Sequence, residues 1–192
     1  QRVACCELAD TLMQIKNGWL IPASEVPSPN TDCRPDIADI SLLVIHNISL
    51  PPNQFGGGYI EQFFTNCLDV EADKYFAEIC NLKVSSHLLI DRLGNITQFA
   101  PFTARAWHAG VSQFDSRENC NDFSIGIEME GADDIAYTDR QYEVLASVTS
   151  VICAKYPRIT PERIVGHSHI APGRKTDPGE AFNWDRYKQM LD

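Results

Sequence analysis

The chain has 192 residues, of which 44% are hydrophobic and 22% charged, and its 16 basic and 26 acidic side chains give a formal net charge of −10. These values are typical of one soluble globular domain whose core needs neither disulfides nor a structural metal. The acidic balance and the scattered placement of the basic residues disfavour a nucleic-acid or membrane-surface partner. We therefore expect a single domain over residues 1–192, a monomer with no nucleic acid and no membrane as partners.

The cysteines are odd in number and lack Cys-x-x-Cys spacing: Cys5, Cys6, Cys33, Cys67, Cys80, Cys120 and Cys153. This usage is typical of reduced thiols in a cytosolic protein rather than of a secreted disulfide framework or a cysteine zinc site. The start of the chain, Gln1 to Glu7, has no signal-peptide core, and no apolar run is long enough to span a membrane. The sequence therefore predicts a cytoplasmic location.

The first half of the chain contains an irregular arm and then a buried strand. Prolines and polar residues loosen the stretch from Ile21 to Asp39, and we interpret residues 1–40 as an N-terminal arm packed on the domain. The aliphatic run from Ser41 to Ile45 predicts a strand buried on both faces that ends at His46. Residues 59–66 and 72–82 are weaker helix candidates.

A hairpin, a second buried strand and two helices are predicted further along. Val84–Ile90 and Asn95–Phe99 flank a short turn that contains Gly94, which predicts a β-hairpin with His87 on its first strand. Residues 123–131 alternate: Phe123, Ile125, Ile127 and Met129 face one way, and Ser124, Gly126, Glu128 and Glu130 the other. The small residues of the second set clear space beside Glu128.

Thr138 to Gln141 has the form of a capping box and predicts a helix that ends before Pro157. A short helix is expected at residues 183–191. Strands interspersed with helices predict an α/β (α+β) domain with a central mixed β-sheet flanked by helices.

One polar segment, His167 to Gly179, follows a short apolar strand and presents a histidine, a cation and a carboxylate on a predicted loop. Imidazole and carboxylate are the usual ligands of a hydrolytic zinc, but a surface loop with ordinary polar residues explains the segment equally well. In an extended segment His169 would point away from His167, which favours a supporting contact over a ligand bond.

Four motifs occur in this order along the chain: His46-Asn47-Ile48-Ser49, Arg105-Ala106-Trp107-His108-Ala109-Gly110, Cys120-Asn121-Asp122-Phe123-Ser124-Ile125-Gly126-Ile127-Glu128, and the segment from His167 to Gly179. Together they resemble the amidase-2 group of zinc N-acetylmuramoyl-L-alanine amidases, and within it the cytosolic AmpD type. The resemblance implies a peptidoglycan-recognition-protein-like fold and a Zn²⁺ ion bound by His46, His167 and Asp177.

The resemblance also implies the catalytic groups. Amide hydrolysis needs a polarised carbonyl, a nucleophilic water and a proton relay, and the relay is assigned to Glu128. Lys175 matches the lysine that stabilises developing negative charge. Read without the motifs, Glu128 fits a solvated strand face, Lys175 an exposed lysine, His46 a buried structural histidine and Asp177 the start of an Asp-Pro turn.

The implied substrate is a small soluble muropeptide with 1,6-anhydro-N-acetylmuramic acid, cut between its lactyl carbonyl and L-alanine. Because such a ligand carries several carboxylates, an acidic protein must gather cations locally, and the candidates are Lys83, Arg105, Arg174 and Lys175. Further candidates for substrate contact are Asn47, His87, Trp107 and His108.

Two positions depart from the family pattern. Lys83 and Asn119 stand where AmpD-type enzymes often have arginine. Lysine keeps the charge but loses the bidentate fork, and asparagine loses the charge, so recognition of the stem peptide is where this chain is expected to differ most.

Three functions are in view: a recycling hydrolase of soluble anhydro-muropeptides, a lytic amidase acting on intact peptidoglycan, and a binding module without catalysis. The complete set of implied ligands and catalytic residues argues against the binding module. The free thiols and the lack of a signal peptide favour the soluble substrate.

Overall fold

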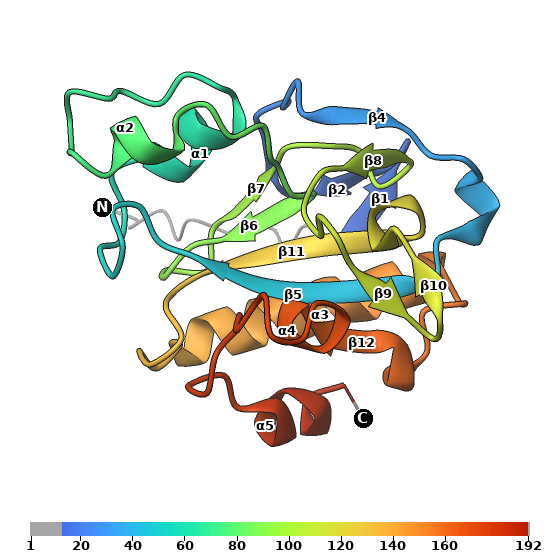
Figure 1. The fold of residues 1–192 in the computed structure, drawn as a ribbon. Coiled ribbons are helices and arrows are strands. Elements are labelled where there is room, and N and C mark those ends of the chain that lie inside the picture. The colour runs from blue at the N-terminus through green and yellow to red at the C-terminus, as the bar shows by residue number, and fades with distance from the viewer. Residues whose placement is uncertain (1–12, 192) are drawn as a thin grey trace, which may run out of the picture.

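Six strands form one mixed sheet at the centre of the protein, which the computed structural model describes from residue 13 to residue 191. The strand order is β12-β5-β11-β6-β7-β3, in which β12, β5, β11 and β6 run parallel and β7 pairs antiparallel with β6 (Figure 1). The sheet strands are β3 (Ser24–Glu25), β5 (Leu42–Ile48), β6 (Leu88–Ile90), β7 (Ile96–Gln98), β11 (Ser124–Glu130) and β12 (Ile164–Gly166). The predicted mixed sheet in a single α+β domain is confirmed.

Short pairs of strands lie outside this sheet. They are β1 (Gln14–Lys16) with β2 (Trp19–Ile21), β4 (Thr31–Cys33) with β8 (Ala104–Ala106), and β9 (Gln113–Phe114) with β10 (Arg117–Glu118). The segment predicted as an irregular arm thus contains β3 and β4, which pair with β7 and β8. Residues 1–12, with Cys5, Cys6 and the segment from Gln1 to Glu7, lie outside the described residues.

The helices are α1 (Tyr59–Phe64), α2 (Phe76–Ile79), α3 (Asp139–Lys155), α4 (His167–Ile170) and α5 (Trp184–Gln189). Single 3₁₀ turns occur at Ile37–Asp39, Cys120–Asp122 and Pro161–Arg163. The capping box of α3 is confirmed: the Thr138 hydroxyl accepts the Gln141 N–H, and the Gln141 side chain accepts the Thr138 N–H, each at 3.1 Å. No helix within residues 13–191 is long and apolar enough to span a membrane.

Several predicted boundaries are corrected by the structure. The helix predicted over residues 72–82 is only the four residues of α2, because Asp73 caps the Tyr75 N–H and diverts the preceding backbone into turns. The first hairpin strand begins at Leu88 rather than Val84. The strand predicted to end at His46 continues to Ile48, so His46 lies inside β5.

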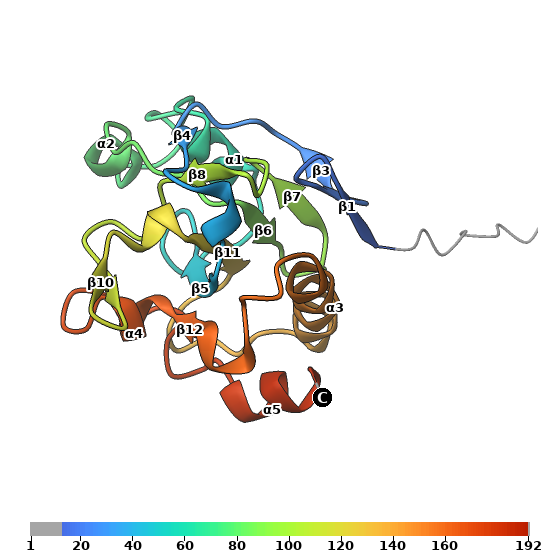
Figure 2. The same ribbon diagram turned by 90° about the vertical axis from the view of Figure 1, so that its right-hand side faces the viewer.

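The two faces of the sheet have different partners, which Figure 2 shows with α3 on one side and α4 on the other. Ile125, Ile127 and Met129 of β11 belong to the main core with α3. On β5, Leu42 and Val44 pack with Ile170 of α4 in a smaller cluster. Since side chains alternate along a strand, His46 shares the α4 face with Leu42 and Val44, and Glu128 lies on the same face of β11.

Candidate active site

The parallel register of β5 and β11 places the first two site residues side by side. Glu128 pairs with His46 in this register, and Met129 pairs with Asn47. Both strands are central and hydrogen-bonded on each edge, so the two side chains project from the rigid middle of the sheet. His167 is the first residue of α4 and directly follows β12, which pairs with β5 on the edge opposite β11.

Three donor atoms converge at this point. His46 Nδ1 lies 3.0 Å from His167 Nδ1 and 3.0 Å from Asp177 Oδ2, and His167 Nδ1 lies 3.1 Å from the same carboxylate oxygen. His46 and His167 are buried and the Asp177 side chain is 13% exposed. Within residues 13–191, these three are the one group of His, Cys, Asp or Glu side chains close enough to hold a metal ion.

The chemistry of this donor set fits a metal ion. His167 Nε2 lies 3.0 Å from the carbonyl oxygen of Ala109, which can only accept, so Nε2 carries the ring proton and Nδ1 presents a lone pair. That lone pair faces a carboxylate oxygen and a second imidazole nitrogen. Two imidazoles and one carboxylate with a fourth position left free are the ligands of a catalytic zinc. The three predicted ligands are thus brought together from β5, α4 and the segment after α4.

The pKa values of the site follow from its burial. Burial lowers the pKa of His46 to about 4, which keeps the imidazole neutral near pH 7 as a metal ligand must be. Burial alone would raise the pKa of Asp177, but hydrogen bonds with His167 and His46 hold it well below its usual range. The Asp177 carboxylate is therefore ionised when the His46 imidazole is neutral.

Glu128 is the second unusual group. Its side chain is buried, and Oε2 has no hydrogen-bond partner among the described residues. Burial raises the pKa of Glu128 well above its usual range, the charge of Asp177 adds to this effect, and the Lys175 ammonium opposes it. The solvated strand face that remained open for Glu128 is therefore excluded, and the group has the properties of a carboxyl that exchanges a proton.

A cavity of about 810 Å³ opens in front of these residues. Its polar walls include Asn47, His108, Glu128, His167, Lys175 and Asp177. Apolar side chains from the α1–α2 region, among them Phe63, Tyr75 and Ile79, form the opposite wall. An adjoining cavity of about 190 Å³ is lined by Lys83, Trp107 and Asn121, and it shares Val84, His108, His167, Arg174 and Lys175 with the first.

Two predicted contact residues lie elsewhere. His87 is fully buried behind the site: its Nδ1 accepts the Gly126 N–H at 3.0 Å, and Nε2 lies 3.1 Å from the Ala104 carbonyl oxygen. The Arg105 guanidinium is paired with Asp122 at 2.5 Å and with Asp32 at 3.3 Å. Neither side chain lines either of these two cavities, and their hydrogen bonds support the surrounding structure; contact of His87 and Arg105 with substrate stays a prediction.

The dense polar segment also differs from the prediction. Its first four residues form the helical turn α4 rather than a loop. His169 Nδ1 accepts the Gly166 N–H at 3.1 Å and its ring packs edge-on against Trp184, so the helix, and not an extended backbone, separates it from the ligands. At the other departure, Asn119 has a left-handed φ of 59°, which asparagine tolerates better than arginine.

Residues that the sequence did not single out complete the site. Asp133 Oδ1 accepts a hydrogen bond from Asn47 at 2.8 Å at the cavity wall. Asn121 belongs to one of the four motifs but has no local pattern that marks it as a site residue. Arg34 lies in the proline-rich segment, where no local pattern distinguishes it. The short interval between Asn121 and the strand that carries Glu128 is the signal that could have drawn attention to the first.

Comparisons with known proteins agree with this geometry. The sequence matches the amidase-2 family, described as N-acetylmuramoyl-L-alanine amidase, over residues 36–180. It is 57% identical over 174 residues to the 1,6-anhydro-N-acetylmuramyl-L-alanine amidase AmpD of Salmonella typhimurium strain SL1344, covering 91% of this chain and 92% of that relative.

Solved structures are similar as well. The crystal structure of a selenomethionine AmpD derivative superposes with a TM-score of 0.91 at 54% identity, over 94% of this chain and 100% of that one. AmpDh3 from Pseudomonas aeruginosa, in complex with an anhydromuramic pentapeptide, has a TM-score of 0.58 at 30% identity, over 79% of this chain and 60% of that one.

Proposed function

Because this chain belongs to the N-acetylmuramoyl-L-alanine amidase family, we propose that a zinc ion held by His46, His167 and Asp177 serves its hydrolysis of anhydro-muropeptides. The activity is that of the AmpD amidases: cleavage of the amide between 1,6-anhydro-N-acetylmuramic acid and L-alanine in peptidoglycan recycling. The observation that carries the zinc proposal is the convergence of two imidazole nitrogens and one carboxylate oxygen within 3.1 Å of one another.

Zinc, when bound, supplies Lewis-acid chemistry, polarising a carbonyl and lowering the pKa of water. The proton must then be moved by the protein, and Glu128 is the group placed for this task. Glu128 lines the larger cavity and its buried Oε2 has no partner within residues 13–191, while its raised pKa favours uptake of a proton and later delivery to the leaving amine of L-alanine.

Lys175 provides the complementary charge. Its ammonium lies at the boundary of both cavities, close enough to lower the pKa values of His46 and Glu128. A cation at this position would stabilise the negative charge that develops on the scissile carbonyl oxygen. The role proposed for Lys175 is therefore electrostatic and greater in the transition state than in the bound substrate.

The smaller cavity supports recognition of the stem peptide. Lys83, Arg174 and Lys175 surround it, so an acidic protein concentrates positive charge where carboxylates would bind. Trp107 Nε1 is buried beside it and has no hydrogen-bond partner in the part of the chain that the structure describes, which suits donation to a substrate carbonyl. Asn47 and His108 complete the proposed contacts from the wall of the larger cavity.

The substrate is a small soluble muropeptide, and we place its hydrolysis in the cytoplasm by a monomer. Cys33 and Cys67 are free and exposed, which suits a reducing compartment. The alternatives are attack on intact peptidoglycan and binding without catalysis. The combination of a ligand set with an unpartnered buried carboxyl supports catalysis, because recognition alone requires neither.

The zinc proposal is tested by metal analysis of purified variants. His46→Ala and Asp177→Ala should lose both zinc and amidase activity while remaining folded, since the main core lies on the other face of the sheet. His169→Gln is the matched control, because it changes a histidine whose ring faces Trp184 and which lies in α4, the helical turn that also carries His167; this variant should keep one zinc per chain. Full zinc content in His46→Ala would refute the assignment.

The choice of substrate is tested separately by mass spectrometry of digests. Soluble anhydro-muropeptide should be cleaved much faster than intact sacculi, because a protein with a net charge of −10 is repelled by an extended anionic polymer. Equal cleavage of both would contradict the recycling assignment and favour the lytic alternative.

A further inference from the structure

The two histidines of the proposed metal site receive their outer contacts from one short segment. His46 Nε2 lies 2.8 Å from His108 Nδ1, and His167 Nε2 lies 3.0 Å from the carbonyl oxygen of Ala109. These are the ring nitrogens that point away from the proposed ion. The orientation of both imidazoles therefore depends on where the chain runs at His108 and Ala109.

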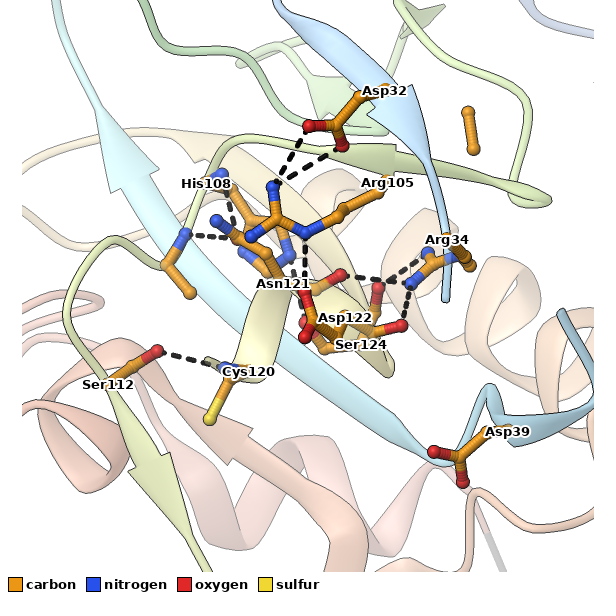
Figure 3. A network of polar contacts seen from close by, with 12 residues as sticks. Asp32, Arg34, Asp39, Arg105, His108, Ser112, Cys120, Asn121, Asp122 and Ser124 are labelled. Atoms are coloured by element: carbon orange, nitrogen blue, oxygen red, sulfur yellow. Dashed lines mark hydrogen bonds and ion pairs between the residues drawn. The ribbon is translucent and has the colours of Figure 1, made fainter. Parts of the chain in front are cut away.

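That segment is fixed by a single side-chain oxygen. Oδ1 of Asn121 accepts the backbone N–H of His108 at 3.1 Å and the N–H of Ala109 at 2.8 Å (Figure 3). Asn121 and both residues it holds are buried. A buried N–H that loses its acceptor costs about 1–3 kcal/mol, so displacement of this backbone from the Asn121 side-chain oxygen is strongly unfavourable.

The backbone at Asn121 is in turn hydrogen-bonded by Arg34. The buried Arg34 guanidinium donates to the backbone oxygens of Asn121 and Asp122, each at 3.1 Å, and to that of Ser124 at 2.7 Å (Figure 3). The Ser124 hydroxyl lies 3.0 Å from His108 Nε2, so both ring nitrogens of His108 are engaged. The 3₁₀ turn Cys120–Asp122 thus ties segment 108–109 to the start of β11.

We propose that Asn121 is a positioning residue that orients both histidines of the metal site by holding the His108–Ala109 backbone. The inference rests on the proposed zinc site. Loss of an outer contact to a metal-binding histidine costs about 10–100-fold in metal affinity, and loss of the Asn121 oxygen loosens two such contacts together.

The test compares zinc affinity, measured by competition with a chelator, in wild type, Asn121→Leu and Asn121→Asp. Asn121→Leu has similar volume and no acceptor, and its zinc dissociation constant should rise by at least about 10–100-fold. Asn121→Asp keeps an oxygen at the same place and should return most of the affinity. The visible spectrum of the cobalt-substituted protein should broaden in Asn121→Leu and recover in Asn121→Asp.

Gln98→Leu is the matched control. Gln98 is equally buried and also bonds backbone groups through its side-chain amide, but at β7, away from the site. It should lose stability and keep its zinc affinity. If Asn121→Leu does not fold, Asn121→Ser serves instead, since its hydroxyl is too short to reach both amides.

Unchanged zinc affinity in Asn121→Leu, or an equal loss in Gln98→Leu, would overturn the inference while leaving the zinc site intact. A wild-type protein that binds no zinc would overturn the zinc site first and the inference with it. The two failures are therefore distinguishable.

Discussion

A methyl group added at Gly126 should destabilise the protein through a direct clash with His108. A Cβ at this residue would lie 2.6 Å from both Cγ and Nδ1 of His108 and 2.9 Å from its Cδ2. Carbon atoms rest at about 3.5–4.0 Å, so the overlap is close to 1 Å. The sequence suggested that small residues clear space beside Glu128, but the space at Gly126 is occupied by the His108 ring.

Neither the Gly126 backbone nor the His108 ring can move away without loss of hydrogen bonds. The Gly126 N–H donates to His87 at 3.0 Å and its oxygen accepts from Ser86 at 2.8 Å, while β11 is paired on both edges. The His108 ring is bonded at both nitrogens, so Gly126→Ala must force it out. Overpacking and the lost hydrogen bonds together should lower the free energy of unfolding by about 2–4 kcal/mol.

The assay is urea unfolding of the metal-free protein in a double-mutant cycle with His108→Ala. Once the ring is gone, Gly126→Ala should cost almost nothing, because its backbone is extended and does not require glycine. The coupling energy should therefore be about 2 kcal/mol or more. If Gly126→Ala were equally destabilising with and without the ring, the steric argument would be wrong.

Three further predictions concern catalysis, substrate binding and pH. Glu128→Gln should retain zinc and lower kcat by about 10²–10⁴-fold, since an amide cannot relay the proton; near-normal turnover of the zinc-loaded variant would contradict this. Lys83→Ala should mainly raise KM for soluble anhydro-muropeptide, whereas Lys175→Ala should mainly lower kcat, and the same kinetic defect in both would count against their separate roles. Burial, helped by the Arg34 charge, lowers the pKa of His87 from 6.5 to about 3, so between these values the unfolded chain binds one proton more than the folded protein. The free energy of unfolding should then fall by about 1.4 kcal/mol for each pH unit of acidification from this group, and His87→Gln should reduce the measured slope by that amount, with an unchanged slope as the contrary result.

The sequence predicted best those features that are encoded locally. The alternation of residues 123–131 placed Glu128 on the face opposite Ile127, and the Thr138 capping box located the start of α3. Both depend on residues within a few positions of one another. The proposed ligands came from motifs of a known family, and the structure brings them within hydrogen-bond distance.

Features that depend on distant partners could not be read in this way. Arg105 looked like a free cation because nothing nearby in sequence reveals Asp32, which approaches through the pairing of β4 with β8. The resemblance suggested His87 for substrate contact, but its burial behind the site depends on Arg34 and the β11 backbone, which its neighbours in sequence do not reveal. The register that pairs Glu128 with His46 likewise appears only when the sheet is assembled.

The proposed metal site is anchored in two parts of unequal stiffness. His46 sits on a strand whose seven residues all pair with β11, in the region of a protein that opens last in hydrogen exchange. His167 and Asp177 belong instead to a single helical turn and the irregular chain that follows it. The two segments are joined by the Ser168 N–H, which donates to the backbone carbonyl oxygen of Asp177 at 3.0 Å. β5 would therefore keep one proposed ligand in place, while α4 and its following segment carry the other two. A local opening that displaces α4 and the segment after it would release two of the three proposed ligands while the sheet stays folded.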